Sequence, residues 1–135
     1  MKKFEDDEIV SPELVGLTGL VLDAQPRLLG GIERSEALIN SIEVFARSMN
    51  SIGVPLCVTE QVPEKLGTTE GRILEACSAS LLLSKDTFSA FGCPDFEKWI
   101  NDHGGDHLLI TGIETPICVY LTAVDAVRRL SLIHI

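Results

Sequence analysis

The chain has 135 residues, of which 45% are hydrophobic and 23% charged, so it can bury one core but is too short for two ordinary domains. Twenty acidic residues against eleven basic ones give a net charge of −9, which excludes the nucleic-acid and membrane-surface binders that need a surplus of Lys and Arg. No stretch approaches the roughly 18 apolar residues of a membrane span, and no hydrophobic region follows Lys2 and Lys3. We therefore expect a protein of the cytoplasm or of an organellar matrix, without nucleic-acid or membrane partners.

Apolar runs alternate with helical patterns along the chain. The predicted strands are residues 17–22, 54–59, 81–83 and 107–111. The predicted helices are residues 35–50, 69–77, 94–101 and a last one that begins near residue 115. An apolar stripe at helical spacing runs along the first helix: Leu38, Ile42, Phe45 and Met49. Because strands separated by helices form parallel sheets with crossover connections, the pattern predicts an α/β sheet that is buried on both faces.

Three chemically active side chains follow the carboxyl ends of predicted strands, where the sites of parallel sheets lie. Asp23 follows the first strand, Lys85 the third and Cys118 the fourth. Because a helix start and a nearby lysine both lower the pKa of a thiol, we expect Cys118 to be a nucleophile with Asp23 as its proton acceptor. Taken alone, each is more often a loop, surface or core residue, and only their joint placement favours a site. The other cysteines are expected to be reduced packing residues: Cys57, Cys77 and Cys93.

Four segments carry a resemblance to a known family. They are VLDAQ at residues 21–25, CVTEQVPEKLGT at 57–68, SKDTFSAF at 84–91 and TGIETPICVYLTA at 111–123. In this order they resemble the isochorismatase-like cysteine hydrolase family. The resemblance implies a Rossmann-like three-layer α/β/α fold with a parallel sheet. It also implies a catalytic triad, carried over here as Asp23, Lys85 and Cys118.

The resemblance further implies a reaction. Asp23 takes the proton of Cys118, the thiolate attacks a small amide or a related C–N compound, and water hydrolyses the resulting thioester. The family typically has a cis peptide bond at the position of Ile113 and Glu114, and its oxyanion hole corresponds to the backbone amides of Glu114 and Cys118. We accordingly expect a small-molecule substrate, no cofactor, and a homo-oligomer in the full-length form.

The segment after the second strand departs from the pattern of nicotinamidases within this family. Those enzymes bind a metal there through an Asp-x-His segment, whereas residues 61–68 contain no histidine, so no metal is expected. Four side chains are expected to line the substrate pocket: Gln25, Gln61, Phe88 and Thr115. Two of these have an alternative, because Gln61 is equally suited to pack a loop, and Phe88 and Phe91 to lie in the core under the third strand.

The last six residues, 130–135, resemble the translation of a common sequencing-adapter end. We therefore expect a single hydrolase domain over residues 1–129, followed by a non-native tail. Since family members continue with further strands, the resemblance implies a C-terminally truncated domain whose last strands are missing and whose strand at 107–111 is an exposed edge. Two alternatives to a hydrolase stay open. One is a non-catalytic interaction or oligomerisation domain, inactive because truncated, and the other is a flavodoxin-like cofactor binder, which would lack its phosphate loop.

Overall fold

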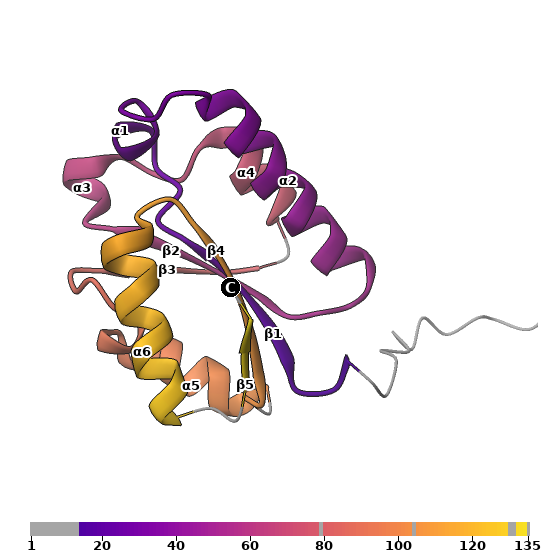
Figure 1. The fold of residues 1–135 in the computed structure, drawn as a ribbon. Coiled ribbons are helices and arrows are strands. Elements are labelled where there is room, and N and C mark those ends of the chain that lie inside the picture. The colour runs from indigo at the N-terminus through magenta and orange to yellow at the C-terminus, as the bar shows by residue number, and fades with distance from the viewer. Residues whose placement is uncertain (1–13, 79, 104, 130–131, 135) are drawn as a thin grey trace, which may run out of the picture.

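The computed structural model describes residues 14–78, 80–103, 105–129 and 132–134. Five parallel strands form one sheet in the order β3-β2-β1-β4-β5. Their bounds are β1 Leu17–Leu22, β2 Leu56–Gln61, β3 Leu81–Lys85, β4 His107–Gly112 and β5 Leu132–His134. Helices cover both faces of the sheet, with α2 and α4 on one side and α5 and α6 on the other (Figure 1). The predicted three-layer α/β/α fold with a parallel sheet is therefore confirmed.

The longer helices lie where the apolar periodicity predicts them, within a few residues at each end. The helices are α1 Pro26–Leu29, α2 Ser35–Ser51, α3 Pro63–Leu66, α4 Gly71–Ala76, α5 Pro94–Asp102 and α6 Tyr120–Arg129. Two turns complete the set, the 3₁₀ turn η2 Ala90–Gly92 and the π-helical turn η3 Thr115–Val119. The sequence did not predict α1 and α3, because a single turn that begins with proline cannot be told from a loop by periodicity. None of the helices in the described ranges combines the length and the apolar character that crossing a membrane requires.

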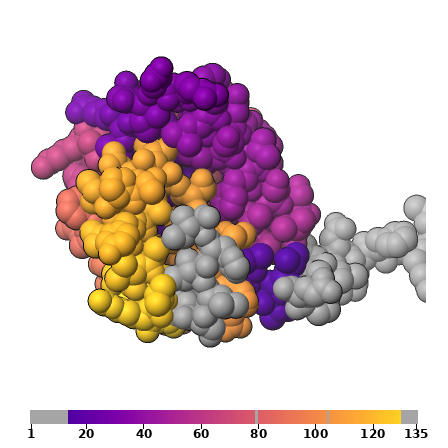
Figure 2. Space-filling view, viewed as in Figure 1, coloured from indigo at the N-terminus to yellow at the C-terminus, as the bar shows by residue number. Residues whose placement is uncertain are grey.

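The core consists of two apolar layers, one on each side of the sheet. Because the side chains of a strand alternate between its faces, β1 contributes Val21 to one layer and Leu20 and Leu22 to the other. The layer of Val21 packs against α2 and α4, and the layer of Leu22 packs against α5 and α6. The helices α2 and α6 form opposite flanks of the molecule (Figure 2). The strand β1 is therefore packed on both of its faces at the centre of the sheet, which fixes the position of the backbone at its carboxyl end.

The residues expected to be a non-native tail take part in the sheet. Residues 132–134 form β5, which pairs in parallel with β4 by the register His107 with Leu132, Leu108 with Ile133 and Leu109 with His134. The prediction of an exposed edge at β4 is therefore wrong. The physical reason is that a strand edge presents unpaired N–H and C=O groups, and any extended segment that reaches it can satisfy them. In the described part of the chain the outer strands are β5 at one end and β3 at the other.

Candidate active site

Asp23 directly follows β1 and is fully buried. Its backbone has a φ of 57°, so the chain turns sharply at the strand end, and its N–H donates to the carbonyl of Thr59 at 3.1 Å. The hydroxyl of Thr59, on the neighbouring strand β2, donates to Asp23 Oδ1 at 2.8 Å. Asp23 is therefore held by both its backbone and its side chain, which is what a positioned proton acceptor requires.

Lys85 is the last residue of β3, and its ammonium group reaches the carboxylate of Asp23. The distance from Lys85 Nζ to Asp23 Oδ2 is 2.8 Å, and both side chains are 0% exposed. The ammonium also donates to Gln61 Oε1 at 2.6 Å and to the carbonyls of Thr87 at 2.8 Å and Phe88 at 3.1 Å. A charge is kept in the interior only when it is paired and its donors are satisfied, and Lys85 meets both conditions.

Cys118 lies in the π-helical turn η3, which follows β4, and only 4% of the residue is exposed. The Asp23 carboxyl group and the Lys85 ammonium both lie close enough to its thiol to shift the thiol pKa, so the three predicted catalytic side chains gather at one place. Burial raises the pKa of Cys118 to about 11; Lys85 opposes this shift, while Asp23 and Glu114 add to it. The expected lowering of the Cys118 pKa is therefore wrong, because burial outweighs the nearby lysine. In this state Cys118 is a neutral thiol.

The backbone before Cys118 differs from the expectation. Every peptide bond in the described residues is trans, so the cis bond predicted between Ile113 and Glu114 is wrong. The chain turns instead at Glu114, whose φ and ψ are −91° and 63°. The Glu114 carbonyl accepts hydrogen bonds from the N–H groups of Ile117 at 3.1 Å and Val119 at 3.2 Å. This shared acceptor opens the wide turn, so the costly cis form is not needed to bring the Cys118 side chain inward.

Gln25, which was predicted to line the substrate pocket, instead uses its side chain to hold the loop after β2. It is fully buried, and its amide nitrogen donates to the carbonyls of Gln61 at 2.9 Å and Gly67 at 2.6 Å. Its amide oxygen accepts from the N–H of Gln61 at 2.7 Å. Gln25 therefore clamps the loop after β2, and no polar atom of its side chain is left to read a substrate.

The other predicted pocket residues lie at separate places around the triad. The side-chain oxygen of Gln61 binds the Lys85 ammonium, so this residue positions the lysine. Thr115 is exposed at the start of η3. The side chain of Phe88 is 56% exposed, so it does not lie in the core, whereas Phe91 is buried there, 5.0 Å from the Phe96 ring. Of the two phenylalanines that were alternatively expected in the core, only Phe91 lies there.

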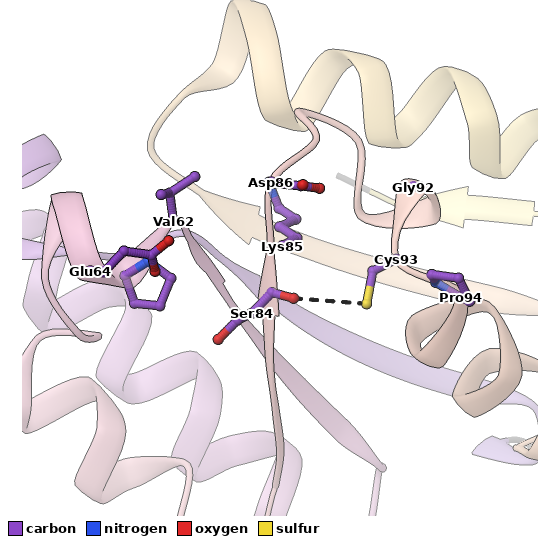
Figure 3. A pocket seen from close by; sticks show the side chains of 9 residues that line it. Val62, Glu64, Ser84, Lys85, Asp86, Gly92, Cys93 and Pro94 are labelled. Atoms are coloured by element: carbon purple, nitrogen blue, oxygen red, sulfur yellow. Dashed lines mark hydrogen bonds between the residues drawn. The ribbon is translucent and has the colours of Figure 1, made fainter.

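A pocket of about 350 Å³ opens beside the carboxyl end of β3 (Figure 3). It lies between the segment from Val62 to Glu64 on one side and Cys93 with Pro94 on the other. Lys85 is among its lining residues, but neither Asp23 nor Cys118 is. The pocket therefore adjoins the lysine end of the triad and does not lie over the thiol.

The sequence did not predict three buried polar residues that support this site: Thr59, Glu60 and Thr69. Thr59 holds Asp23, as described above, and Glu60 accepts hydrogen bonds from the N–H and hydroxyl of Thr69 at 2.8 and 2.9 Å. All three are buried polar residues. A signal was present, because polar residues at the end of a buried strand need partners. No group of three or more His, Cys, Asp or Glu side chains suited to a metal ion occurs in the residues that the structure describes.

Comparisons with known proteins identify proteins that are similar to this chain. The isochorismatase domain model matches residues 19–129. The chain is 28% identical over 114 residues to isochorismatase domain-containing protein 1 of Danio rerio, an alignment that covers 84% of this chain and 40% of that protein. Its fold superposes on the structure of MAR1 ribonuclease from Caenorhabditis elegans with a TM-score of 0.80 and 25% identity, covering 89% of this chain and 62% of that one.

A third relative is the YcaC gene product of Escherichia coli, described as an octameric hydrolase of unknown specificity. The TM-score is 0.76 at 20% identity, and the match covers 83% of this chain and 57% of that chain. The chain thus spans between two fifths and somewhat over three fifths of the length of these three relatives. The family match over residues 19–129 confirms the resemblance read from the four sequence segments, and the chain belongs to the isochorismatase family, with the fold of its hydrolases.

Proposed function

We propose that this chain carries the active site of a cysteine hydrolase that cleaves a small amide or a related C–N compound through a thioester. One observation supports this most directly: the Asp23 carboxylate pairs with the Lys85 ammonium at 2.8 Å, and both groups lie close enough to the Cys118 thiol to shift its pKa. A base, a cation and a nucleophile grouped at one place are the parts that acyl transfer needs.

The proposed reaction starts from the neutral thiol. Asp23 takes the proton of Cys118 as the sulfur adds to the carbonyl carbon of the substrate, which forms the C–S bond and a tetrahedral oxyanion. The C–N bond then breaks, and the protonated Asp23 returns its proton to the leaving nitrogen. Water attacks the thioester, Asp23 takes a proton from that water, and the departing sulfur regains a proton as the acid is released.

Lys85 acts in this proposal by its charge. It lowers the pKa of Cys118 against the effect of burial, and so favours the thiolate while Asp23 holds the proton. The backbone amides of Glu114 and Cys118 are assigned to the developing oxyanion. Because the thiolate is itself the nucleophile and residues 61–68 hold no histidine, the proposal includes no metal and no cofactor.

A second candidate is a non-catalytic interaction or oligomerisation domain with the same fold. It is favoured by the burial of Cys118, which is 4% exposed and whose thiol has a pKa of about 11. For either candidate we propose a cytoplasmic protein. We also propose that it forms a homo-oligomer, which the octameric description of the YcaC relative supports.

Turnover with a panel of small amides tests the two candidates. The panel contains primary amides, nicotinamide and N-carbamoyl amino acids, and the readout is released ammonia together with the intact mass of the protein. The hydrolase predicts ammonia release and a transient acyl adduct on Cys118, both lost in Cys118→Ala and Asp23→Asn. Lys98→Met, which removes a surface lysine of α5, is the matched control and should retain activity. Activity that survives Cys118→Ala would contradict the hydrolase, and a folded chain inert toward the whole panel favours the non-catalytic domain.

A further inference from the structure

The strand β3 leaves one edge of the sheet open. It pairs with β2 on its inner side, and the described part of the chain places no strand on its outer side. The carbonyl of Lys85 accepts from Val62 N–H at 2.9 Å, so Lys85 faces inward. Because backbone groups alternate in direction along a strand, Leu82 and Ser84 present their N–H and C=O groups outward, and the Ser84 carbonyl there accepts a long hydrogen bond of 4.0 Å from the Cys93 thiol (Figure 3). The outer edge of β3 is therefore a row of backbone donors and acceptors.

This edge lacks the usual protection against strand addition. Natural edge strands are commonly guarded by a proline, a bulge or an outward lysine. The sequence of β3 is LLLSK, and its lysine is turned into the triad with a side chain that is 0% exposed. Leu81 and Leu82 are instead 38% and 46% exposed. An unguarded edge with exposed leucines is the kind of edge that accepts another strand.

Hollows lie along both faces of this edge. On one face a pocket of about 500 Å³ is lined by Leu82 together with Leu74 and Cys77. On the other, a pocket of about 260 Å³ is lined by Leu81 and Leu83 together with Trp99. Side chains of an added strand alternate between the two faces, so successive apolar residues would enter these two hollows in turn.

The rim of this edge is acidic. Five carboxylates line the pockets along β3: Glu64, Glu75, Asp86, Asp95 and Asp102. The two lysines among the lining residues are paired, Lys85 with Asp23 and Lys98 with Asp102, and within the described ranges no cation lies at ion-pair distance from Glu64, Glu75 or Asp86. A second copy of this chain carries the same acidic rim, so charge provides no attraction between two β3 edges. Basic side chains next to an added strand would be attracted.

We propose that the outer edge of β3 binds an extended, basic segment of a partner protein as an added sixth strand. The backbone of the segment pairs with Leu82 and Ser84, its apolar side chains enter the two hollows, and its Lys or Arg side chains lie against the acidic rim. This surface is separate from the chemistry at Cys118, so the proposal stands or falls independently of the proposed hydrolase.

Binding of a synthetic peptide to the full chain tests the proposal. The probe is a fluorescein-labelled peptide of sequence KVLVKLR, and its control is the same peptide with alternate backbone amides N-methylated, which keeps the charge but prevents strand pairing. Binding is followed by fluorescence anisotropy at two salt concentrations. The N-methylated control should bind about tenfold more weakly or worse, and the affinity of the probe should fall as salt increases.

Two protein variants separate strand addition from general charge attraction. Leu82→Lys places a charge on the edge and should weaken probe binding by about tenfold or more. Val44→Lys makes the same charge change on α2, at a side chain that is 64% exposed, and should leave binding unchanged. Should Leu82→Lys fail to fold, hydrogen exchange of the wild type replaces it, and the probe should slow exchange of the Leu82 and Ser84 amides.

Three results would overturn the proposal. One is equal affinity for the probe and for its N-methylated control. Another is an equal loss of probe affinity in Leu82→Lys and in Val44→Lys. Either result would mean that charge attraction alone binds the probe. The third is a concentration-dependent dimer of the chain, measured by sedimentation, that Leu82→Lys abolishes, because the occupant of the edge is then a second copy.

Discussion

The buried ion pair of Lys85 and Asp23 predicts a large loss of stability in Lys85→Met. The substitution keeps the length of the side chain but removes one ion pair and three hydrogen bonds of 2.6, 2.8 and 3.1 Å. It leaves the Asp23 carboxylate, whose side chain is 0% exposed, with the Thr59 hydroxyl and the Cys118 thiol as its side-chain neighbours. Breaking a buried pair by removing one member typically costs about 3–5 kcal/mol, and that loss in the free energy of unfolding is expected here.

Urea denaturation at neutral pH measures this loss, with two comparison variants. Lys98→Met removes a lysine that is 76% exposed from its pair with Asp102 and should leave the stability unchanged. Asp23→Asn combined with Lys85→Met removes the orphaned charge, so the double variant should be more stable than Lys85→Met alone. The reasoning is refuted if Lys85→Met unfolds at the same urea concentration as Lys98→Met, or if the effects of the two changes at the pair simply add.

Three further predictions concern the surroundings of the site. Thr59→Val removes the donor to Asp23 Oδ1 at 2.8 Å and should lower the free energy of unfolding by about 1–3 kcal/mol in urea titrations, whereas Thr59→Ser should retain most of it. Gln25→Ala removes three buried hydrogen bonds from the loop after β2 and should speed proteolysis between residues 61 and 67, and unchanged cleavage there would speak against the clamp. Burial raises the pKa of Cys57 to about 12 and of Cys118 to about 11 from 9.0, so the unfolded chain ionises these thiols first. Their contribution to stability should be complete below pH 9 and be lost as pH rises toward 12, and a variant with alanine at both positions should show a shallower fall in urea denaturation from pH 8 to 11.

The parallel sheet and the convergence of three side chains could be predicted because both depend on periodicity. Alternating strands and helices require crossover connections, and parallel strands bring their carboxyl ends to one edge. That geometry is enough to bring Asp23, Lys85 and Cys118 together from positions far apart in the chain. The ion pair at 2.8 Å and the effect of both charged groups on the Cys118 pKa agree with it.

The roles of the two glutamines could not be predicted from their places after strands. Gln25 and Gln61 are both polar residues near the end of a strand, so their positions in the sequence do not show which role each side chain has. Their roles depend on which partner lies within about 3 Å. Gln25 meets two carbonyls and an N–H of the loop, whereas Gln61 meets the ammonium of Lys85.

The sequence by itself determined the fold class, the order of the elements and the strand ends at which the reactive side chains lie, because these follow from local hydrophobic periodicity and the geometry of parallel strands. Only the tertiary structure decided the protonation of Cys118, the trans backbone at Glu114, the pairing of β5 and the open edge of β3. The thiol protonation, the pairing of β5 and the open edge of β3 depend on groups distant in sequence, whereas the backbone at Glu114 depends on hydrogen bonds within its own turn. The balance between burial and the nearby Lys85 charge determines the pKa of the Cys118 thiol. The unpaired backbone groups of an edge strand determine where another strand can bind.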